Sequence, residues 1–321
     1  MSGARITVVN TLGGALHHYS TALVATLGGD AAGVRLIRVD EPSVAGGSAL
    51  AWLGRTLRAL VGARRSGGRV LVTWPVLGHL DRIVMRVVLG GRADAAIVVH
   101  DPRPLVHARG YGRLARWAGG WFGRRVRLIV HSETARADLR HDCPGDTALL
   151  LPHPVAPRRL PVRSPRDEMC VVRVLGQYKP DRDVDLLRAL ADRLSGSNRL
   201  EVIGRGWPAV DGWEVRDAFV DEVELDRLIA TADVVLVPYR RFYQSGVAIR
   251  ALELGTPAVG PAGSSMSDLY PDDRYLAGDS IGSWCAAIER AIGASRDGTA
   301  ALARAADARA RGAWRGVYAV S

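Results

Sequence analysis

The stretch from Thr231 to Leu269 decides the fold, and it reads TADVVLVPYRRFYQSGVAIRALELGTPAVGPAGSSMSDL. Its apolar run, Val234 to Val237, is short and rich in β-branched residues, which predicts a buried strand rather than a helix. Pro238 and Tyr239 end this strand, and a polar loop follows. Because open α/β sheets bind ligands at the carboxyl ends of their strands, the loop is a candidate binding segment.

A helix follows the polar loop. Ser245-Gly246 predicts its N-cap, residues 247–254 have helical spacing, and Gly255 and Pro257 end it. The next strand, at 258–260, begins at once. The first turn of such a helix presents N–H groups without intrahelical acceptors, and these favour an anion.

The alternation of strand and helix continues through the rest of the chain. It predicts parallel sheets covered on both faces, which is an α/β architecture. In the helix at 48–64 one apolar face is expected, formed by Leu50, Leu53, Leu57, Leu60 and Val61. The other expected strands lie at 6–10, 34–39, 69–73, 95–99, 126–130, 148–151, 170–175 and 200–203, and the other expected helices at 15–27, 81–89, 111–122, 133–140, 184–194, 221–230, 281–292 and 300–314.

Length and composition restrict the class of protein. A chain of 321 residues is long enough for two domains, each with its own core. The cysteines, Cys143, Cys170 and Cys285, are odd in number and far apart, which fits neither a disulfide framework nor a zinc cluster. No hydrophobic leader precedes the first strand, and no apolar run approaches about 18 residues. We therefore expect a cytoplasmic protein.

Positive charge is concentrated in the first half of the chain. Residues 1–160 hold 22 arginines against 10 acidic residues, whereas the whole chain has a net charge of +10. This asymmetry indicates an acidic partner such as an anionic membrane surface, a diphosphate-linked acceptor or nucleic acid. The alternative is a composition that simply favours arginine, since Lys179 is the single lysine. Residues 111–125 combine aromatic residues with arginines, a pattern found both at membrane interfaces and in ordinary cores.

Residues Ala251 to Pro257, ALELGTP, resemble the donor-site segment of GT-B glycosyltransferases, in which a helix ends in Ala-x-x-x-Gly-x-Pro. Trp74-Pro75, His100-Asp101 and His131-Ser132 are similar in order and spacing to first-lobe motifs of bacterial members that build exopolysaccharides or lipid-linked glycans. The resemblance implies two Rossmann-like domains that face a cleft. The first, acceptor-side domain would span residues 1–160 and be rejoined by a C-terminal helix at about 300–321. The donor-binding domain would span 161–300.

The resemblance also implies which residues act. His100 would contact the donor sugar near the reacting carbon, and Asp101 is the candidate general base if the reaction inverts. Lys179 and Arg182 would neutralise the diphosphate, because the charge of the leaving group requires cationic donors. Retaining members usually carry two glutamates where this chain has Phe242 and Arg250. The residues expected to bind the donor are Gly13, Gly14, Lys179, Arg182, Gly204, Tyr239, Gln244, Ser245, Gly246 and Arg250.

These features predict a glycosyltransferase that uses a UDP or GDP sugar of mannosyl, glucosyl or glucuronosyl type. Its acceptor would be a glycan, a lipid-linked molecule or a secondary metabolite. No further cofactor and no metal are expected, because the histidines are scattered and the cysteines lie apart. Two other classes remain open: a sugar-nucleotide epimerase with the same two-lobed architecture, and a basic nucleic-acid-binding protein, for which no recognition motif is seen.

Overall fold

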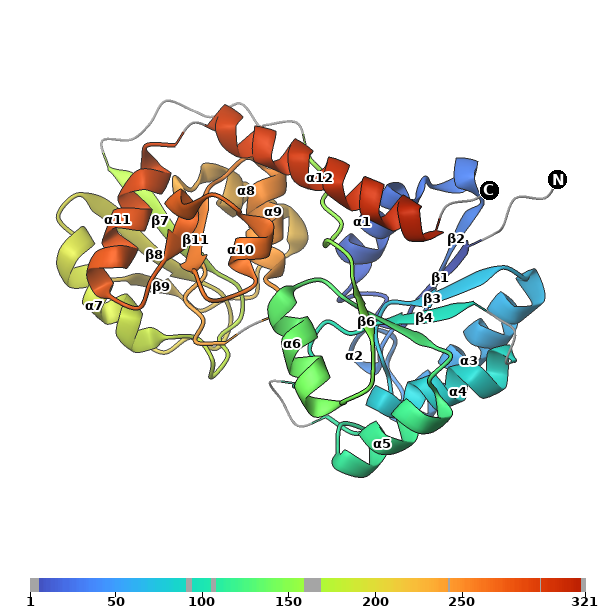
Figure 1. Cartoon of the computed structure of the whole chain (residues 1–321). Helices are drawn as coiled ribbons and strands as arrows, with labels where there is room; N and C mark the ends of the chain where they lie inside the picture. Colours follow the sequence, from blue (N-terminus) through green and yellow to red (C-terminus); the bar gives the residue numbers. More distant parts are fainter. Residues whose placement is uncertain are drawn as a thin grey trace. The chain divides into compact units, whose positions relative to one another are not determined.

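The computed structural model describes residues 6–90, 94–104, 108–158, 169–241, 243–294 and 296–318 (Figure 1). The chain divides into two units. The first contains the residues up to Pro154 and those from Arg309 onward, and the second runs from Val155 to Ala308. The boundaries expected from the sequence were residue 160 and about residue 300. The long helix α12 (Arg296–Tyr318) contains the second boundary.

The first unit is built on a six-stranded, fully parallel sheet with the order β2-β1-β3-β4-β5-β6. Its strands are β1 (Ile6–Asn10), β2 (Val34–Arg38), β3 (Arg69–Val72), β4 (Ala95–Val98), β5 (Arg127–Val130) and β6 (Ala148–Leu150). Its helices are α1 (His17–Leu27), α2 (Pro42–Ala45), α3 (Ala49–Ser66), α4 (Asp81–Leu89), α5 (Arg113–Phe122) and α6 (Glu133–Asp142), with 3-10 turns η1 (Asp30–Ala32) and η2 (Gly78–Leu80).

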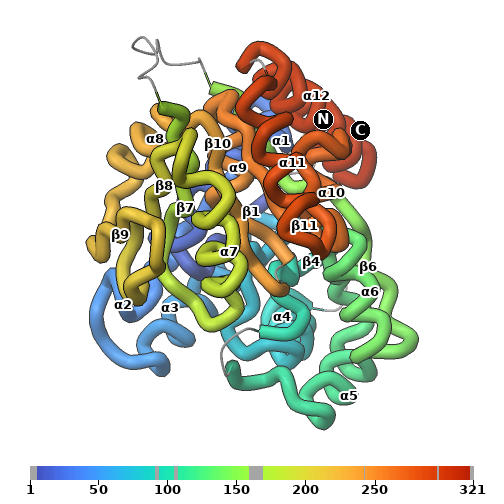
Figure 2. The backbone as a smooth tube through the Cα atoms, turned by 90° about the vertical axis from the view of Figure 1, so that its left-hand side faces the viewer, coloured from blue at the N-terminus to red at the C-terminus, as the bar shows by residue number. Residues whose placement is uncertain are grey.

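The second unit has a parallel sheet of the same size with the order β9-β8-β7-β10-β11-β12, part of which is seen in Figure 2. Its strands are β7 (Cys170–Leu175), β8 (Asn198–Ile203), β9 (Glu214–Arg216), β10 (Val234–Leu236), β11 (Ala258–Pro261) and β12 (Leu276–Ala277). Its helices are α7 (Val184–Leu194), α8 (Glu222–Thr231), α9 (Gly246–Glu253), α10 (Met266–Leu269) and α11 (Ile281–Ile292), with the 3-10 turn η3 (Asp273–Tyr275).

Strand order reverses once in each sheet. The reversal falls between β1 and β3 in the first unit and between β7 and β10 in the second. The loops that leave two such strands run to opposite sides of the sheet, and open α/β proteins bind their ligands at this point. The fold therefore selects the loops after β1 and β3, and those after β7 and β10, as the places to look for a site.

The prediction of the apolar face of α3 is partly wrong. Leu50 and Val61 are exposed, and the buried residues are Thr56, Ala59, Leu60 and Ala63. These four positions follow the i, i+3, i+4, i+7 spacing of one helix face. Three of the four are small, because the helix packs closely on its neighbours, so side-chain hydrophobicity alone did not identify this face.

Helix α12 ties the C-terminal end of the chain to the first unit. The buried Trp314 donates its indole N–H to the carbonyl of Pro152 at 2.9 Å, and Arg311 donates to the carbonyl of Ala25 at 3.0 Å. Trp314 and Tyr318 also enter the apolar core that contains Ile6, Leu23 and other residues of β1 and α1. This end of α12 is thus an integral part of the first unit.

The core of the second unit contains a buried ion pair. Arg173 on β7 pairs with Glu201 on β8 and also donates to the carbonyl of Leu228 at 2.6 Å. Exposed Arg199 contacts the same carboxylate at 2.7 Å. A buried pair contributes little net stability, but removal of one partner leaves the other charge buried and unpaired.

We expect Glu201→Gln to lower the free energy of unfolding of the second unit by about 3–5 kcal/mol, because Arg173 would lose its counter-charge. Arg199→Gln is the matched control and should cost about 1 kcal/mol or less, since its side chain is solvated. Denaturant unfolding followed by tryptophan fluorescence measures both. Equal losses for the two variants would contradict this account.

Candidate functional site

The reversal point of the second sheet brings the loops after β7 and β10 together. Arg182 and Tyr239 form an antiparallel β-bridge, and the amide of Asp183 donates to the carbonyl of Pro238 at 2.7 Å. The amide of Arg240 donates to the carbonyl of Asp181 at 2.8 Å. Two loops that lie about 55 residues apart in sequence are thus held as one structure.

Arg182 is the central side chain of this structure. It is 4% exposed, and its guanidinium lies 4.3 Å from the centre of the Tyr239 ring and 5.3 Å from that of Trp207. It donates to the carbonyl of Leu175 at 2.8 Å, while its Nε has no hydrogen-bond partner among the described residues. No carboxylate of the described chain pairs with it. Burial lowers the pKa of the Arg182 guanidinium from its usual value.

Glycines make room for this arginine. A Cβ at Gly176 would lie 3.1 Å from the Arg182 Nη2 atom, and Gly176 has a φ of 96°. A Cβ at Gly204 would lie 2.2 Å from the carbonyl oxygen of Gly176, so the ends of β7 and β8 meet without any side chain between them. Gly204 is therefore required for the close packing that supports the loop after β7.

Helix α9 begins beside the same loops. The Ser245 hydroxyl accepts a hydrogen bond from the amide of Ala248 at 3.2 Å, as predicted for an N-cap. The amides of Gly246 and Val247 then have no acceptor within the helix. Val247 lies near Arg182, because both side chains approach the same Cβ position of Gly176, at 3.7 and 3.1 Å. Gln244 is half-buried and directly precedes the cap.

Lys179 is exposed, and its carbonyl accepts a hydrogen bond from the amide of Arg182 at 2.9 Å. Lys179, the single lysine of the chain, thus lies in the same turn as Arg182, but its side chain is in solvent whereas that of Arg182 is buried. Among the described residues no three His, Cys, Asp or Glu side chains are placed to hold a metal ion.

Two Asp-x-Asp spacings occur in the same loop and were overlooked in the sequence, at Asp181, Asp183 and Asp185. Asp183 caps α7 by accepting from the amide of Leu186 at 3.0 Å, and it pairs with Arg240 at 3.2 Å. Asp185 pairs with Arg240 as well, also at 3.2 Å. The Asp183 and Asp185 carboxylates therefore support the loop. Burial opposes ionisation of Asp183, but Arg240 outweighs it and lowers the pKa of this carboxyl.

Arg250, which was expected at the donor, is placed differently from Arg182. It is buried and pairs with Asp226 at 2.8 Å and with Glu222 at 3.6 Å, so its charge already has partners on α8. Its observed role is to join α9 to α8. Phe242 lies outside the described residues.

In the first unit, His100 lies in an aromatic cluster at the strand ends. The rings of Tyr19 and His131 meet it edge to face, Trp74 stacks on its ring at 5.6 Å, and His153 contacts Tyr19 and His131. The buried His100 donates from Nε2 to the carbonyl of Thr73 at 3.0 Å. His131 and His153 were not identified as candidate site residues from the sequence. Each follows a strand end, at β5 and β6, and that position was the available signal.

Hydrogen bonds fix the protonation of His131. Its Nδ1 lies 2.8 Å from the carbonyl of Leu151, which can only accept, so Nδ1 carries the proton. Its Nε2 then accepts from the Tyr19 hydroxyl at 2.9 Å. Burial, followed by the nearby His153 and His100, holds the pKa of His131 well below its ordinary value. Burial also lowers the pKa of His153, to about 3. These two histidines are neutral at physiological pH.

The side chain of Asp101 has different surroundings from that of its neighbour His100. It is half-buried and lies close enough to Tyr111 for its charge to add to the effect of burial in raising the pKa of that phenol. Asp101 is therefore on the Tyr111 side of β4, while His100 enters the aromatic cluster.

The glycine loop after β1 is occupied by a carboxylate of the chain itself. The amides of Gly14 and Ala15 donate to Glu41 at 3.2 and 3.1 Å. A Cβ at Gly13 would lie 2.1 Å from an Asp40 carboxylate oxygen and 3.2 Å from the Asp40 Cα, so a side chain there would displace Asp40. Gly13 and Gly14 thus allow close packing, and the two amides offered by the loop already have an anionic acceptor.

Comparison with known proteins identifies the fold. The sequence matches no protein-family model and no curated protein. Sucrose-phosphate synthase from Thermosynechococcus elongatus is similar over 99% of this chain and 100% of its own, with a TM-score of 0.64 and 15% identity. The galactosyltransferase WaaB of the lipopolysaccharide outer core is similar over 98% of this chain and 99% of its own, with a TM-score of 0.61 and 12% identity. Anabaena HepE in complex with UDP and glucose is similar over 97% of this chain and 95% of its own, with a TM-score of 0.59 and 13% identity.

The chain therefore has the GT-B fold of glycosyltransferases, with two Rossmann-like units that each carry a six-stranded parallel sheet. This confirms the fold class predicted from the sequence. Among the described residues, no helix is both long enough and apolar enough to cross a bilayer.

Arg182→Met should leave the free energy of unfolding of the ligand-free second unit unchanged or raise it by about 1 kcal/mol or more, because it removes a buried charge without a counter-ion. Arg173→Met is the matched control and should destabilise, since the buried Glu201 would keep only the half-exposed Arg199 as its arginine partner. Chemical denaturation measures both. A loss of several kcal/mol in Arg182→Met would mean that the arginine is structural.

The neutral His131 makes stability depend on pH. Its folded pKa lies below the ordinary value of about 6.5, so the unfolded chain binds the extra proton first as pH falls. Stability of the first unit should be unaffected above about pH 7 and decrease below about pH 6.5, by up to about 1.4 kcal/mol per pH unit for this group. His131→Asn should reduce that slope in thermal unfolding from pH 7 to pH 5. Exposed His141→Asn is the matched replacement, and an unchanged slope in His131→Asn would contradict the assignment.

Proposed function

We propose that the protein is a nucleotide-sugar-dependent glycosyltransferase whose second unit binds the diphosphate of a UDP or GDP sugar. The observation that carries the proposal is Arg182, a buried guanidinium without a carboxylate partner in the described chain, at the point where strand order reverses. A buried cation is costly unless an anion neutralises it. The amides of Gly246 and Val247, which have no acceptor within α9, and the exposed Lys179 supply further positive character nearby.

The proposed reaction breaks the bond between the anomeric carbon and the diphosphate oxygen and transfers the glycosyl group to an acceptor hydroxyl. Arg182 and the start of α9 stabilise the charge that develops on the leaving diphosphate, and this accounts for a reaction without a metal. His100 contacts the donor sugar, and Asp101 accepts the acceptor proton if the configuration inverts. The UDP complex of HepE is consistent with a uridine nucleotide as the donor.

We propose a glycan, a lipid-linked molecule or a secondary metabolite as the acceptor, and polysaccharide biosynthesis in the cytoplasm as the setting. The WaaB similarity supports an acceptor of glycoconjugate type. Peripheral association with an anionic membrane belongs to the same proposal, because lipid-linked acceptors are held at such a surface.

Arg182→Ala should weaken binding of UDP or GDP by about ten- to a hundredfold, the value of a charge-assisted hydrogen bond. Calorimetric titration should show uridine or guanosine binding unchanged, because the nucleosides lack the diphosphate. Arg188→Ala, a half-exposed arginine on α7, is the matched control. An equal loss for nucleoside and nucleotide, or no nucleotide binding by the wild type, would defeat the proposal.

Product analysis separates transfer from epimerisation. The proposed transferase should release nucleoside diphosphate only when an acceptor is present, and EDTA should not abolish the release. An altered sugar nucleotide formed without an acceptor would favour the epimerase.

A further inference from the structure

Helix α5 buries its smallest residues. A Cβ at Gly119 would lie 2.4 Å from the carbonyl oxygen of His79, and a Cβ at Gly123, just after the helix, would lie 2.4 Å from the Cβ of Arg82. Neither position accepts a side chain, so α5 packs directly on the backbone of η2 and on α4. The inward face of the helix is consequently made of glycine rather than of large apolar residues.

The large apolar residues of α5 face water instead. Leu114 is 76% exposed, Trp117 60%, Trp121 65% and Phe122 47%, and the rings of Trp117 and Phe122 meet edge to face at 6.1 Å. Four such side chains on one ten-residue helix are more than the scattered exposed residues of an ordinary surface. The alternative that these aromatics are core is excluded for both tryptophans.

Positive charge surrounds this apolar surface. Residues 102–132 contain seven arginines and no acidic residue. Arg113 and Arg124, at the two ends of α5, are exposed and form no ion pair with the described residues. Because they are not neutralised by the protein, they are available to an anionic partner.

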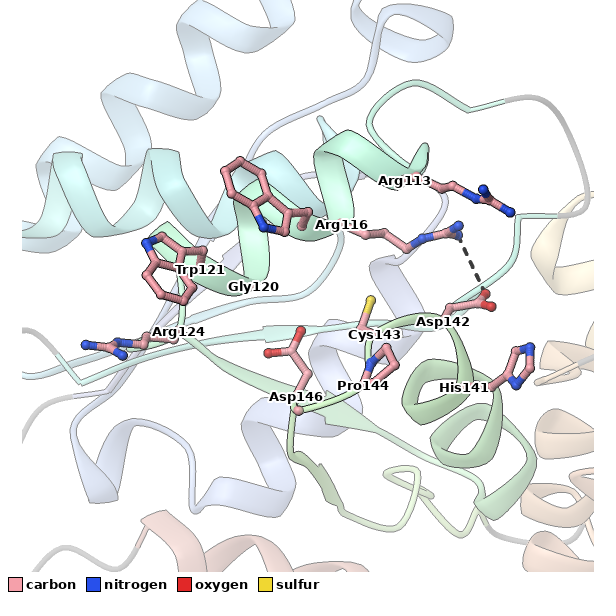
Figure 3. A pocket seen from close by; sticks show the side chains of 12 residues that line it. Arg113, Arg116, Gly120, Trp121, Arg124, His141, Asp142, Cys143, Pro144 and Asp146 are labelled. Atoms are coloured by element: carbon pink, nitrogen blue, oxygen red, sulfur yellow. Dashed lines mark ion pairs between the residues drawn. The ribbon is translucent and has the colours of Figure 1, made fainter.

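A groove of about 620 Å³ lies between α5 and residues 141–146 (Figure 3). Arg113, Arg116, Trp121 and Arg124 line one side of it, and Arg116 reaches toward Asp142 at 3.7 Å. The two acidic side chains of the groove have arginine partners elsewhere: Arg103 contacts Asp142 at 2.8 Å, and Arg82 contacts Asp146 at 2.6 Å. The groove therefore keeps a positive character.

We propose that the α5 face, formed by Leu114, Trp117, Trp121 and Phe122 together with Arg113 and Arg124, docks on an anionic phospholipid surface and that the groove receives a headgroup phosphate. Exposed tryptophans beside arginines suit the boundary between headgroups and acyl chains. Charge favours this occupant over a second copy of the chain, since a symmetric pair would bring the unneutralised arginines together. Nucleic acid would engage the arginines but would leave Leu114 and Phe122 in water.

The inference rests on the proposed membrane association and is independent of sugar transfer. Co-sedimentation of the full chain with phosphatidylcholine vesicles, with and without phosphatidylglycerol, tests it. We expect binding only to the anionic vesicles, weakened by added salt. Trp117→Ala/Trp121→Ala should reduce binding at least tenfold, and Arg113→Gln/Arg124→Gln by about twenty-five-fold, from roughly fivefold per arginine.

Arg58→Gln/Arg65→Gln on α3 and Phe219→Ala are matched controls, because they remove exposed charge and exposed aromatic surface elsewhere. All of them should bind vesicles as the wild type does. UDP binding, measured in parallel, reports folding and keeps failure of this inference distinct from failure of the proposed transferase. Undiminished vesicle binding by the tryptophan variant overturns the docking surface. The docking surface is also overturned if the wild type forms a dimer, or binds duplex DNA tightly, and the tryptophan variant loses that property.

Discussion

The buried charge of Arg182 is the constraint on which the second unit depends. Its guanidinium lies tightly against Gly176, Tyr239 and Trp207 present ring faces to it, and the loop after β10 pairs with the loop after β7. Cation–π contacts compensate only a part of the cost of desolvation. The arrangement is therefore costly without an anion, and this is how sites that bind anions are usually built.

The strand ends of the first unit follow the opposite principle, because their polar groups have partners within the protein. Glu41 accepts from the amides of the glycine loop, and His131 is bonded on both ring nitrogens, to Tyr19 and Leu151. Polar groups that are bonded in this way suit neutral hydroxyl groups better than a phosphate. This contrast is in line with the proposal that the second unit binds the donor diphosphate, although the glycine pair had been expected at the donor as well.

The sequence predicted most of the strands and helices because their periodicity is local. Arg182 was expected at the donor from the resemblance to GT-B glycosyltransferases, and that role stays a proposal. The sequence did not predict the short strands β9 and β12, which have too few residues to show a period. Nor could it show that Arg250 is neutralised from α8 or that Glu41 occupies the glycine loop. Those contacts join residues 24 and 27 positions apart, and no local pattern records them.

The same limit applies to α5, because the sequence allows its aromatic residues to belong either to the core or to a membrane interface. Close approach of Gly119 and Gly123 to η2 and α4 decides between them, because a helix that can bury only glycine must turn its tryptophans outward. A composition that favours arginine over lysine explains why the cationic residues around α5 are arginines. It does not explain why residues 102–132 lack any acidic residue. The lack of acidic residues in this segment, together with the arginine partners of Asp142 and Asp146 in the groove, reduces repulsion from an anionic surface, so charge and packing favour the same kind of partner.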